Sequence, residues 1–288
     1  MDLSEKFKKN TEELVPLKEK ASRYRGWEMY SEPDKMVRFK EHVLEQRERE
    51  KAQGVFIAKS GYGSLDEITG GFRPGQLVIL SAPTGQGKTA FLQDMTRKFV
   101  GQGVECAWFS FEVPPTELAE RFGEESEWPD FSIPNQLKES RFQWFKDRTE
   151  EAVAKYGTRI VFIDHLHYLL DMNKAVDSRS ISIYFGMLLR ELKLFAIETG
   201  ITIFLVSHLT KTDFDEVPKL ADLRDSSFVG QTADFVILMY RKTRKDKSLP
   251  IGYEYLNESV VYVAKNRWNG KFGSIHFAFE KGRFHEIL

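Results

Sequence analysis

The sequence has few cysteines, no long apolar run and no signal-peptide pattern, and each of these absences excludes a class of protein. It has a single cysteine, Cys106, which excludes an intramolecular disulfide framework and a cysteine-rich zinc site. No apolar run approaches the roughly 18 residues that a membrane-spanning helix needs. Residues 1–6 are charged and lack the apolar stretch of a signal peptide. We therefore expect a cytoplasmic protein with no membrane partner.

An excess of charge of either sign is also missing. The formal net charge is −1, so any nucleic-acid site must be a local patch rather than a general positive coat. The charge is unevenly spread, because the charged residues in 112–151 are mainly acidic and those in 241–288 are mainly basic. Ordinary solvated faces explain such stretches equally well. With 288 residues and 41% hydrophobic content, the chain can bury the core of one large α/β domain.

Residues 1–53 are charged and show no strand pattern. Ser31 and Pro33 predict a helix start, and Met36, Phe39 and Val43 then recur at helical spacing. This short apolar stripe predicts a helical segment or linker that packs either on its own domain or on a neighbouring subunit. Residues 54–288 form the predicted main domain.

Strands and helices alternate within residues 54–288. Short apolar runs at 77–80, 104–111, 160–163, 201–206 and 235–239 predict strands, and residues 88–100 and 182–199 predict helices between them. Strands that are apolar on both faces indicate a parallel sheet covered by helices on both sides. Three further runs, at 259–263, 274–279 and 283–287, are joined by turns and predict an antiparallel C-terminal extension.

A phosphate-binding loop lies between the first predicted strand and the following helix, where such a loop belongs. Glycines let backbone N–H groups face the phosphates, Lys88 supplies a charge to the β- and γ-phosphates, and the Thr89 hydroxyl binds Mg²⁺. The predicted cofactors are ATP and Mg²⁺. The predicted nucleotide-binding residues are Thr84, Gly85, Gln86, Gly87, Lys88, Thr89 and Ala90.

Polar residues follow three other predicted strands. Asp164 ends an apolar run and is expected to hold the hydration shell of the Mg²⁺. Glu112 is the predicted activator of the attacking water, with a helix cap before Pro114 as the alternative. His208 is expected to sense the γ-phosphate or merely to end its strand. A metal cluster of Asp164, His165 and His167 is a weaker alternative, since no further His or Cys completes it.

These motifs, in this order, resemble the ATPase domain of hexameric replicative DNA helicases, the DnaB-type enzymes with their phage and Twinkle relatives. Residues 63–77 resemble the family's entry to the loop strand, Phe109-Ser-Phe-Glu112 its catalytic-glutamate motif and Val206-Ser-His208 its sensor. Residues 222–226 and 231–234 resemble its DNA-loop motif, and residues 265–270 its trans-acting stretch. The resemblance covers residues 54–288 and implies a RecA-like P-loop fold.

The resemblance also implies a mechanism. Six copies would form a ring with ATP at each subunit junction and single-stranded DNA in the centre. Lys265 and Arg267 resemble residues that reach the neighbour's site, and no arginine follows the phosphate loop or Asp164 at a plausible position within one chain. Gln231 resembles the residue that couples the γ-phosphate to the DNA loop. Primase, polymerase and a helicase loader are further candidate partners.

Four basic residues are expected to contact DNA phosphates without reading bases. Arg224 matches the family motif, whereas Lys174, Arg179 and Lys211 are inferred from loop position alone. The predicted function is an ATP-driven, ring-forming DNA helicase that moves from 5′ to 3′. Two alternatives stay open: a strand-exchange ATPase of the RecA or RadA type, and a nucleotide-gated single-strand binder or helicase loader.

Overall fold

The computed structural model describes most of the chain. The described residues are 37–53, 56–111, 113–137, 142–165, 169, 178–209, 217–223, 226–246, 248 and 253–287. The chain divides into two units, residues 1–55 and 56–288. In the first unit the described element is helix α2 (Phe39–Gln53). The predicted cap Ser31 and the stripe residue Met36 lie outside the described residues.

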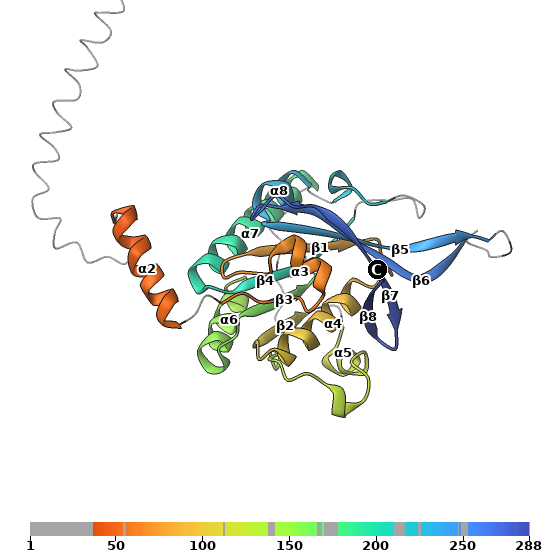
Figure 1. Cartoon of the computed structure of the whole chain (residues 1–288), viewed down its shortest axis with the longest axis horizontal. Coiled ribbons are helices and arrows are strands. Elements are labelled where there is room, and N and C mark those ends of the chain that lie inside the picture. Colours follow the sequence, from red (N-terminus) through yellow and green to blue (C-terminus); the bar gives the residue numbers. More distant parts are fainter. Residues whose placement is uncertain are drawn as a thin grey trace, which may run out of the picture. The chain divides into compact units, whose positions relative to one another are not determined.

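Eight strands of the second unit form one sheet, drawn in Figure 1. Its order is β2-β3-β4-β1-β5-β6-β7-β8, in which the first five strands run parallel and the last three are antiparallel. The strands are β1 (Leu77–Ala82), β2 (Cys106–Ser110), β3 (Ile160–Asp164), β4 (Thr202–His208), β5 (Phe235–Lys245), β6 (Tyr253–Asn266), β7 (Gly273–Glu280) and β8 (Arg283–Ile287).

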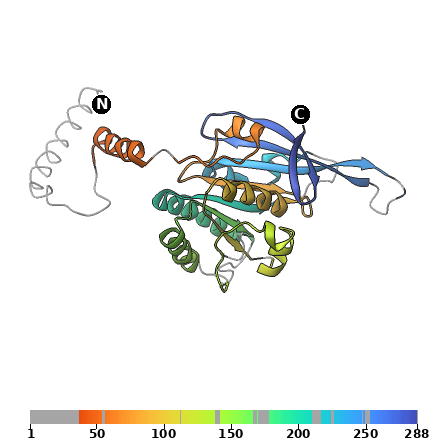
Figure 2. The same cartoon turned by 60° about the horizontal axis from the view of Figure 1, so that its bottom comes forward.

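Helices cover both faces of this sheet, as Figures 1 and 2 show. One face carries α3 (Gly63–Thr69), α4 (Lys88–Gly101) and α5 (Pro115–Glu120), and the other carries α6 (Phe142–Tyr156), α7 (Ser178–Thr199) and α8 (Ser226–Thr232). Two short 3₁₀ helices, η2 (Glu125–Glu127) and η5 (Leu220–Asp222), lie in the connections.

The central strand β1 explains why the core has two halves. Side chains alternate along a strand, so Val78 and Leu80 join the cluster under α4, while Leu77 and Ile79 join the cluster under α7. All six residues of β1 are buried. Cys106 is buried as well, and this burial raises the pKa of its thiol. A strand that is apolar on both faces belongs in the middle of a covered parallel sheet.

The predicted fold class is confirmed, including the antiparallel extension after β5. The extension begins earlier than expected, because β5 and β6 form a long hairpin that projects beyond the rest of the sheet (Figures 1 and 2). Among the described residues, no helix has both the length and the apolar character needed to cross a bilayer.

Candidate functional site

The phosphate loop joins the buried central strand β1 to the start of α4. Gly85 and Gly87 have φ angles of 76° and 91°, in the left-handed region that favours glycine. Gly87 is the residue before the helix, so the first N–H groups of α4 are presented at the carboxyl end of β1. A loop that ends at a helix N-terminus in the middle of a parallel sheet suits an anion such as a triphosphate.

The side chain of Lys88 is held against this loop. Its Nζ donates to the carbonyl oxygens of Ala82, at 3.0 Å, and Pro83, at 3.1 Å. The residue is buried although it carries a charge. These bonds fix the ammonium at the mouth of the loop, where a bound phosphate would meet it.

Thr89 and Asp164 meet although they are far apart in the sequence. The Thr89 hydroxyl donates to Asp164 Oδ2 at 3.0 Å, and His165 Nδ1 lies 3.1 Å from Asp164 Oδ1. Asp164 is fully buried at the end of β3, and His165 has a φ angle of 70°, unusual for a residue with a side chain. A half-buried hydroxyl bonded to a buried carboxylate beside a phosphate loop offers the oxygen ligands that Mg²⁺ prefers.

A cavity of about 420 Å³ opens at this point. Its volume is in the range of small-molecule sites. It is lined by Thr84, Gly85, Gly87, Lys88, Thr89, Ala90, Val113, Glu117, Arg121 and His165. Six of the seven predicted nucleotide-binding residues therefore share one cavity. The exception is Gln86, whose buried side chain turns towards β5 and accepts a bond from the backbone N–H of Arg241 at 2.7 Å.

Arg121 is a residue that sequence reasoning missed. It lines the nucleotide cavity and forms an ion pair with Glu117 at 2.6 Å. The expectation that no arginine of the same chain reaches this site is therefore wrong. Arg121 was overlooked because its position depends on how α5 folds back after β2, for which the local sequence carries no signal.

Of two further predicted residues, His208 and Glu112, the structure describes the backbone of the first. His208 ends β4, and its backbone pairs in register with Ala82, the residue before the phosphate loop. Glu112 lies outside the described residues, but Ser110, two positions earlier, pairs with Asp164. Among the described residues, no group of three His, Cys, Asp or Glu side chains could hold a metal ion. His167, a member of the alternative metal cluster, lies outside the described residues.

Lys265 and Arg267 contact the C-terminal end of α8. Lys265 Nζ donates to the carbonyl oxygens of Gly230 and Ala233, and the Arg267 guanidinium donates to the carbonyl oxygen of Gln231 at 2.6 Å. Neither basic residue lines the nucleotide cavity of its own chain. Burial, with the charge of Arg267 beside it, lowers the pKa of Lys265 from 10.5 to about 8.

Asp234 connects this cluster to the phosphate-loop strand. Its Oδ2 accepts the N–H of Leu77 at 2.8 Å and a bond from Lys193 Nζ at 2.6 Å. Its Oδ1 lies 3.9 Å from Arg267. Sequence reasoning placed Asp234 in a motif but did not foresee that it would link β1, α7 and the trans-acting stretch.

The structure describes little of the predicted DNA contacts. Lys174, Lys211 and Arg224 lie outside the described residues, and only the backbone of Arg179, at the start of α7, is described. On the DNA-loop motif, Asp222 accepts the backbone N–H of Lys219 at 2.7 Å, and Leu223 pairs with Leu209. The pairing of Leu223 with Leu209 connects the motif to the end of β4.

The chain is similar in sequence to known replicative helicases. The chain is 26% identical over 252 residues to the replicative DNA helicase DnaB of Leifsonia xyli, covering 77% of this chain and 53% of the relative. It is 27% identical over 275 residues to a probable plasmid replicative DNA helicase of Chlamydia psittaci, covering 84% and 58%. The chain thus spans little more than half the length of these relatives.

A solved structure shows the same fold. A DnaB-like replicative helicase, described together with its interactions with primase, is 25% identical and aligns with a TM-score of 0.68. The alignment covers 95% of this chain and 72% of that one. A model of the DnaB-like helicase C terminal domain matches residues 58–128 and 134–286. Because these two segments make up most of the chain, it belongs to the DnaB-like helicase C terminal domain family.

Proposed function

We propose that this chain is the ATP-driven motor of a ring-forming replicative DNA helicase that moves on single-stranded DNA from 5′ to 3′. The observation that carries the proposal is the contact between Thr89 and Asp164 beside the phosphate loop. It brings the two oxygen ligands of a metal–nucleotide site together at the carboxyl edge of the sheet. Membership of a helicase family, rather than one of strand-exchange proteins, supports the choice of reaction.

Within one chain, each residue has a separate task in ATP hydrolysis. The N–H groups of the phosphate loop and Lys88 bind the phosphates, while Glu112 takes a proton from the attacking water. Thr89 and Asp164 would hold Mg²⁺, which neutralises charge on the phosphates when bound. His208 would report whether the γ-phosphate is present, and the register of its backbone with Ala82, the residue before Pro83 in the loop, supports this role.

At the subunit junction, Arg267 and Lys265 would act on the neighbour's nucleotide. Both lie outside their own nucleotide cavity, and the Arg267 side chain is 51% exposed. Each is bonded to the end of α8, the helix that joins the two segments of the DNA-loop motif. Gln231, on the same turn, would couple the γ-phosphate to DNA. Arg224, Lys174, Arg179 and Lys211 are the proposed phosphate contacts in the channel.

The proposed partners are single-stranded DNA, further copies of this chain in a hexamer or similar ring, and a primase, polymerase or loader. The interactions with primase described for the similar helicase support the primase. Residues 1–53 are proposed to contact a neighbouring subunit. The bacterial origin of the relatives supports a cytoplasmic site of action.

Strand displacement tests the function directly. The chain is incubated with ATP, Mg²⁺ and labelled duplexes that carry a single-stranded arm at either the 5′ or the 3′ end. In a second measurement, its assembled mass is determined with an ATP analogue and an oligonucleotide. We expect DNA-stimulated ATP hydrolysis, displacement with the 5′ arm and a ring-sized mass. Lys88→Ala serves as the inactive control. ATP-gated DNA binding without displacement would show a binder or loader, and a nucleotide-dependent filament would show a strand-exchange protein.

A further inference from the structure

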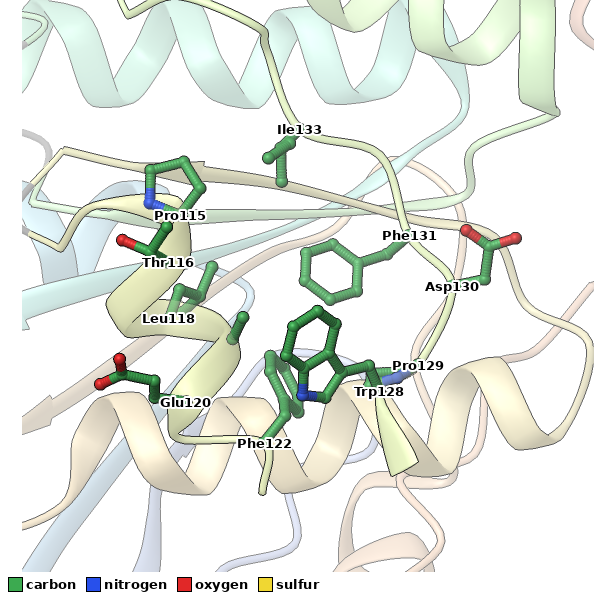
Figure 3. Close-up of a pocket in the computed structure, with 11 residues that line it drawn as sticks. Pro115, Thr116, Leu118, Glu120, Phe122, Trp128, Pro129, Asp130, Phe131 and Ile133 are labelled. Carbon is green, nitrogen blue, oxygen red and sulfur yellow. The ribbon is translucent and has the colours of Figure 1, made fainter. Parts of the chain in front are cut away.

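A second cavity, of about 550 Å³, lies between α5 and residues 128–133 (Figure 3). Its apolar floor is formed by Leu118 and Phe122, both buried, together with Phe131. Trp128 and Ile133 stand at the opening, where they are 45% and 44% exposed. Large apolar side chains around an open hollow are typical of a site that accepts another apolar group.

Hydrogen bonds and ring packing hold the walls of this cavity in place. Ser132 pairs with the edge strand β2, accepting the N–H of Trp108 and donating to the carbonyl oxygen of Cys106, both at 2.9 Å. The indole N–H of Trp128 donates to the carbonyl oxygen of Gly123 at 3.0 Å. Phe122 and Phe131 pack with ring centroids 5.5 Å apart. The cavity is therefore formed before any ligand arrives.

The family match is interrupted at the outer wall. It covers residues 58–128 and 134–286 and leaves residues 129–133 unmatched. Pro129, Asp130, Phe131 and Ile133 all come from this unmatched stretch. The family model therefore does not account for these four side chains.

The rim of the cavity is strongly acidic. Residues 117–130 contain six carboxylates and one basic residue, Arg121, which is paired with Glu117. Glu127 lies 3.5 Å from Arg283. Within the described part of the chain, the exposed residues Glu120, Glu124, Glu125 and Asp130 make no ion pair. Glu120 and Asp130 also line the cavity itself.

We propose that this cavity is a docking site for a peptide segment of a partner protein, which inserts one large apolar side chain between Trp128 and Phe122 and places Lys or Arg on the acidic rim. The apolar floor explains the anchor, and the unpaired carboxylates explain the flanking charges. A neutral small molecule would fill the floor but leave the rim without a partner.

Helix α5 connects this site to the nucleotide cavity. Leu118 and Phe122 face the apolar cavity, while Glu117 and Arg121 line the nucleotide cavity. A peptide anchored on one side of α5 therefore contacts the element that carries Arg121 to the other side. Docking is expected to change ATP turnover.

The site is tested by selecting binders from a random peptide library on the purified full chain without nucleotide, so the result does not depend on helicase activity. We expect peptides with an aromatic or branched apolar anchor flanked by Lys or Arg, and affinity that falls as salt rises. A selected peptide is then measured against variants by fluorescence anisotropy.

Two variants change the site in different ways. Ala119→Trp fills the cavity from α5 and should weaken binding by about tenfold or more. Asp130→Lys changes only the exposed rim and should weaken binding about fivefold. Glu150→Lys, an exposed charge reversal on α6 that does not line the cavity, should bind like the unchanged chain. A saturating amount of the peptide should change ATP turnover in the unchanged chain and not in Ala119→Trp.

Three results would overturn the proposal. One is a selection that yields no such consensus. Another is a peptide that binds all three variants equally well. The third is an assembled chain that does not bind the peptide, together with a lower assembled mass in Asp130→Lys. That pair of results would show that a second copy of the chain covers the cavity. A peptide that docks without any change in ATP turnover would overturn the coupling through α5.

Discussion

Replacing Arg267 by alanine separates a structural role from a catalytic one. In the folded chain its guanidinium donates to the carbonyl oxygen of Gln231 at 2.6 Å and lies 3.9 Å from Asp234. The side chain is 51% exposed, so solvent screens both contacts. We therefore expect Arg267→Ala to lower the free energy of unfolding by no more than about 1 kcal/mol.

The expected effect on ATP hydrolysis is much larger. A trans-acting arginine that meets the charge of the phosphoryl-transfer transition state accelerates hydrolysis by about 10³-fold or more. At about 1.4 kcal/mol for each factor of ten, this is roughly 4 kcal/mol, several times the structural cost. Arg267→Ala should therefore fold, assemble and bind ATP almost normally, yet hydrolyse it poorly.

The assay combines the DNA-stimulated rate of hydrolysis, the affinity for a fluorescent ATP analogue, the assembled mass and the unfolding midpoint. Arg244→Ala is the matched control, because Arg244, on β5, is also an exposed arginine, 69% exposed and paired with Glu254. It should leave the rate unchanged. Arg121→Ala tests the alternative source of positive charge, since Arg121 lines the cavity of its own chain.

Mixing shows whether Arg267 acts between subunits. An Arg267→Ala chain keeps its phosphate loop, and a Lys88→Ala chain keeps its arginine. Some junctions in a mixed ring pair two intact partners, so activity should exceed the sum of the separate proteins. Crosslinking across the junction accompanies the assay, because sequential coupling around the ring can hide this gain. A normal DNA-stimulated rate in Arg267→Ala alone would refute the assignment, above all if Arg121→Ala loses the activity instead.

The other predictions concern chemistry, DNA and pH. Lys88→Ala should lose ATP binding, whereas Glu112→Gln should bind ATP and lose turnover by orders of magnitude, and near-normal hydrolysis in Glu112→Gln would move the water-activating role elsewhere. Arg224→Ala should weaken single-strand binding regardless of sequence and flatten its salt dependence, and an unchanged salt slope would remove Arg224 from the channel. Since the pKa of Lys265 is about 8, its positive charge is lost as pH rises through that value. Turnover should fall between about pH 7 and 9, and Lys265→Arg should flatten this fall. A fall of the same size in Lys265→Arg would exclude Lys265 as its cause.

The central sheet and the phosphate loop could be predicted because their signals are local. Each strand from β1 to β4 is a short apolar run, and the loop is a fixed pattern between a strand and a helix. The bounds of β6 could not be predicted. Its first six residues are partly or fully exposed, because the hairpin projects beyond the sheet, so they follow no apolar alternation.

The composition of the site beyond the loop depends on tertiary structure. Arg121 reaches the nucleotide cavity because α5 turns back after β2, and no spacing in the sequence indicates that turn. The stretch around Trp128 belongs to the mainly acidic residues 112–151, but only its pairing with β2 reveals a cavity. Charge patterns show that a segment is unusual, whereas packing decides what the segment encloses.

The contacts around α8 limit how DNA and ATP can be coupled in the proposed function. This seven-residue helix is about 10 Å long, with residues 222–226 of the DNA-loop motif at its start and the bonds from Lys265 and Arg267 at its end. Asp234, directly beyond, is bonded to the N–H of Leu77 at the start of β1. A displacement of the DNA loop therefore reaches the trans-acting residues through one short helix. Because β1 is buried and paired on both sides with β4 and β5, it would be the fixed point for any movement of that helix in the proposed function.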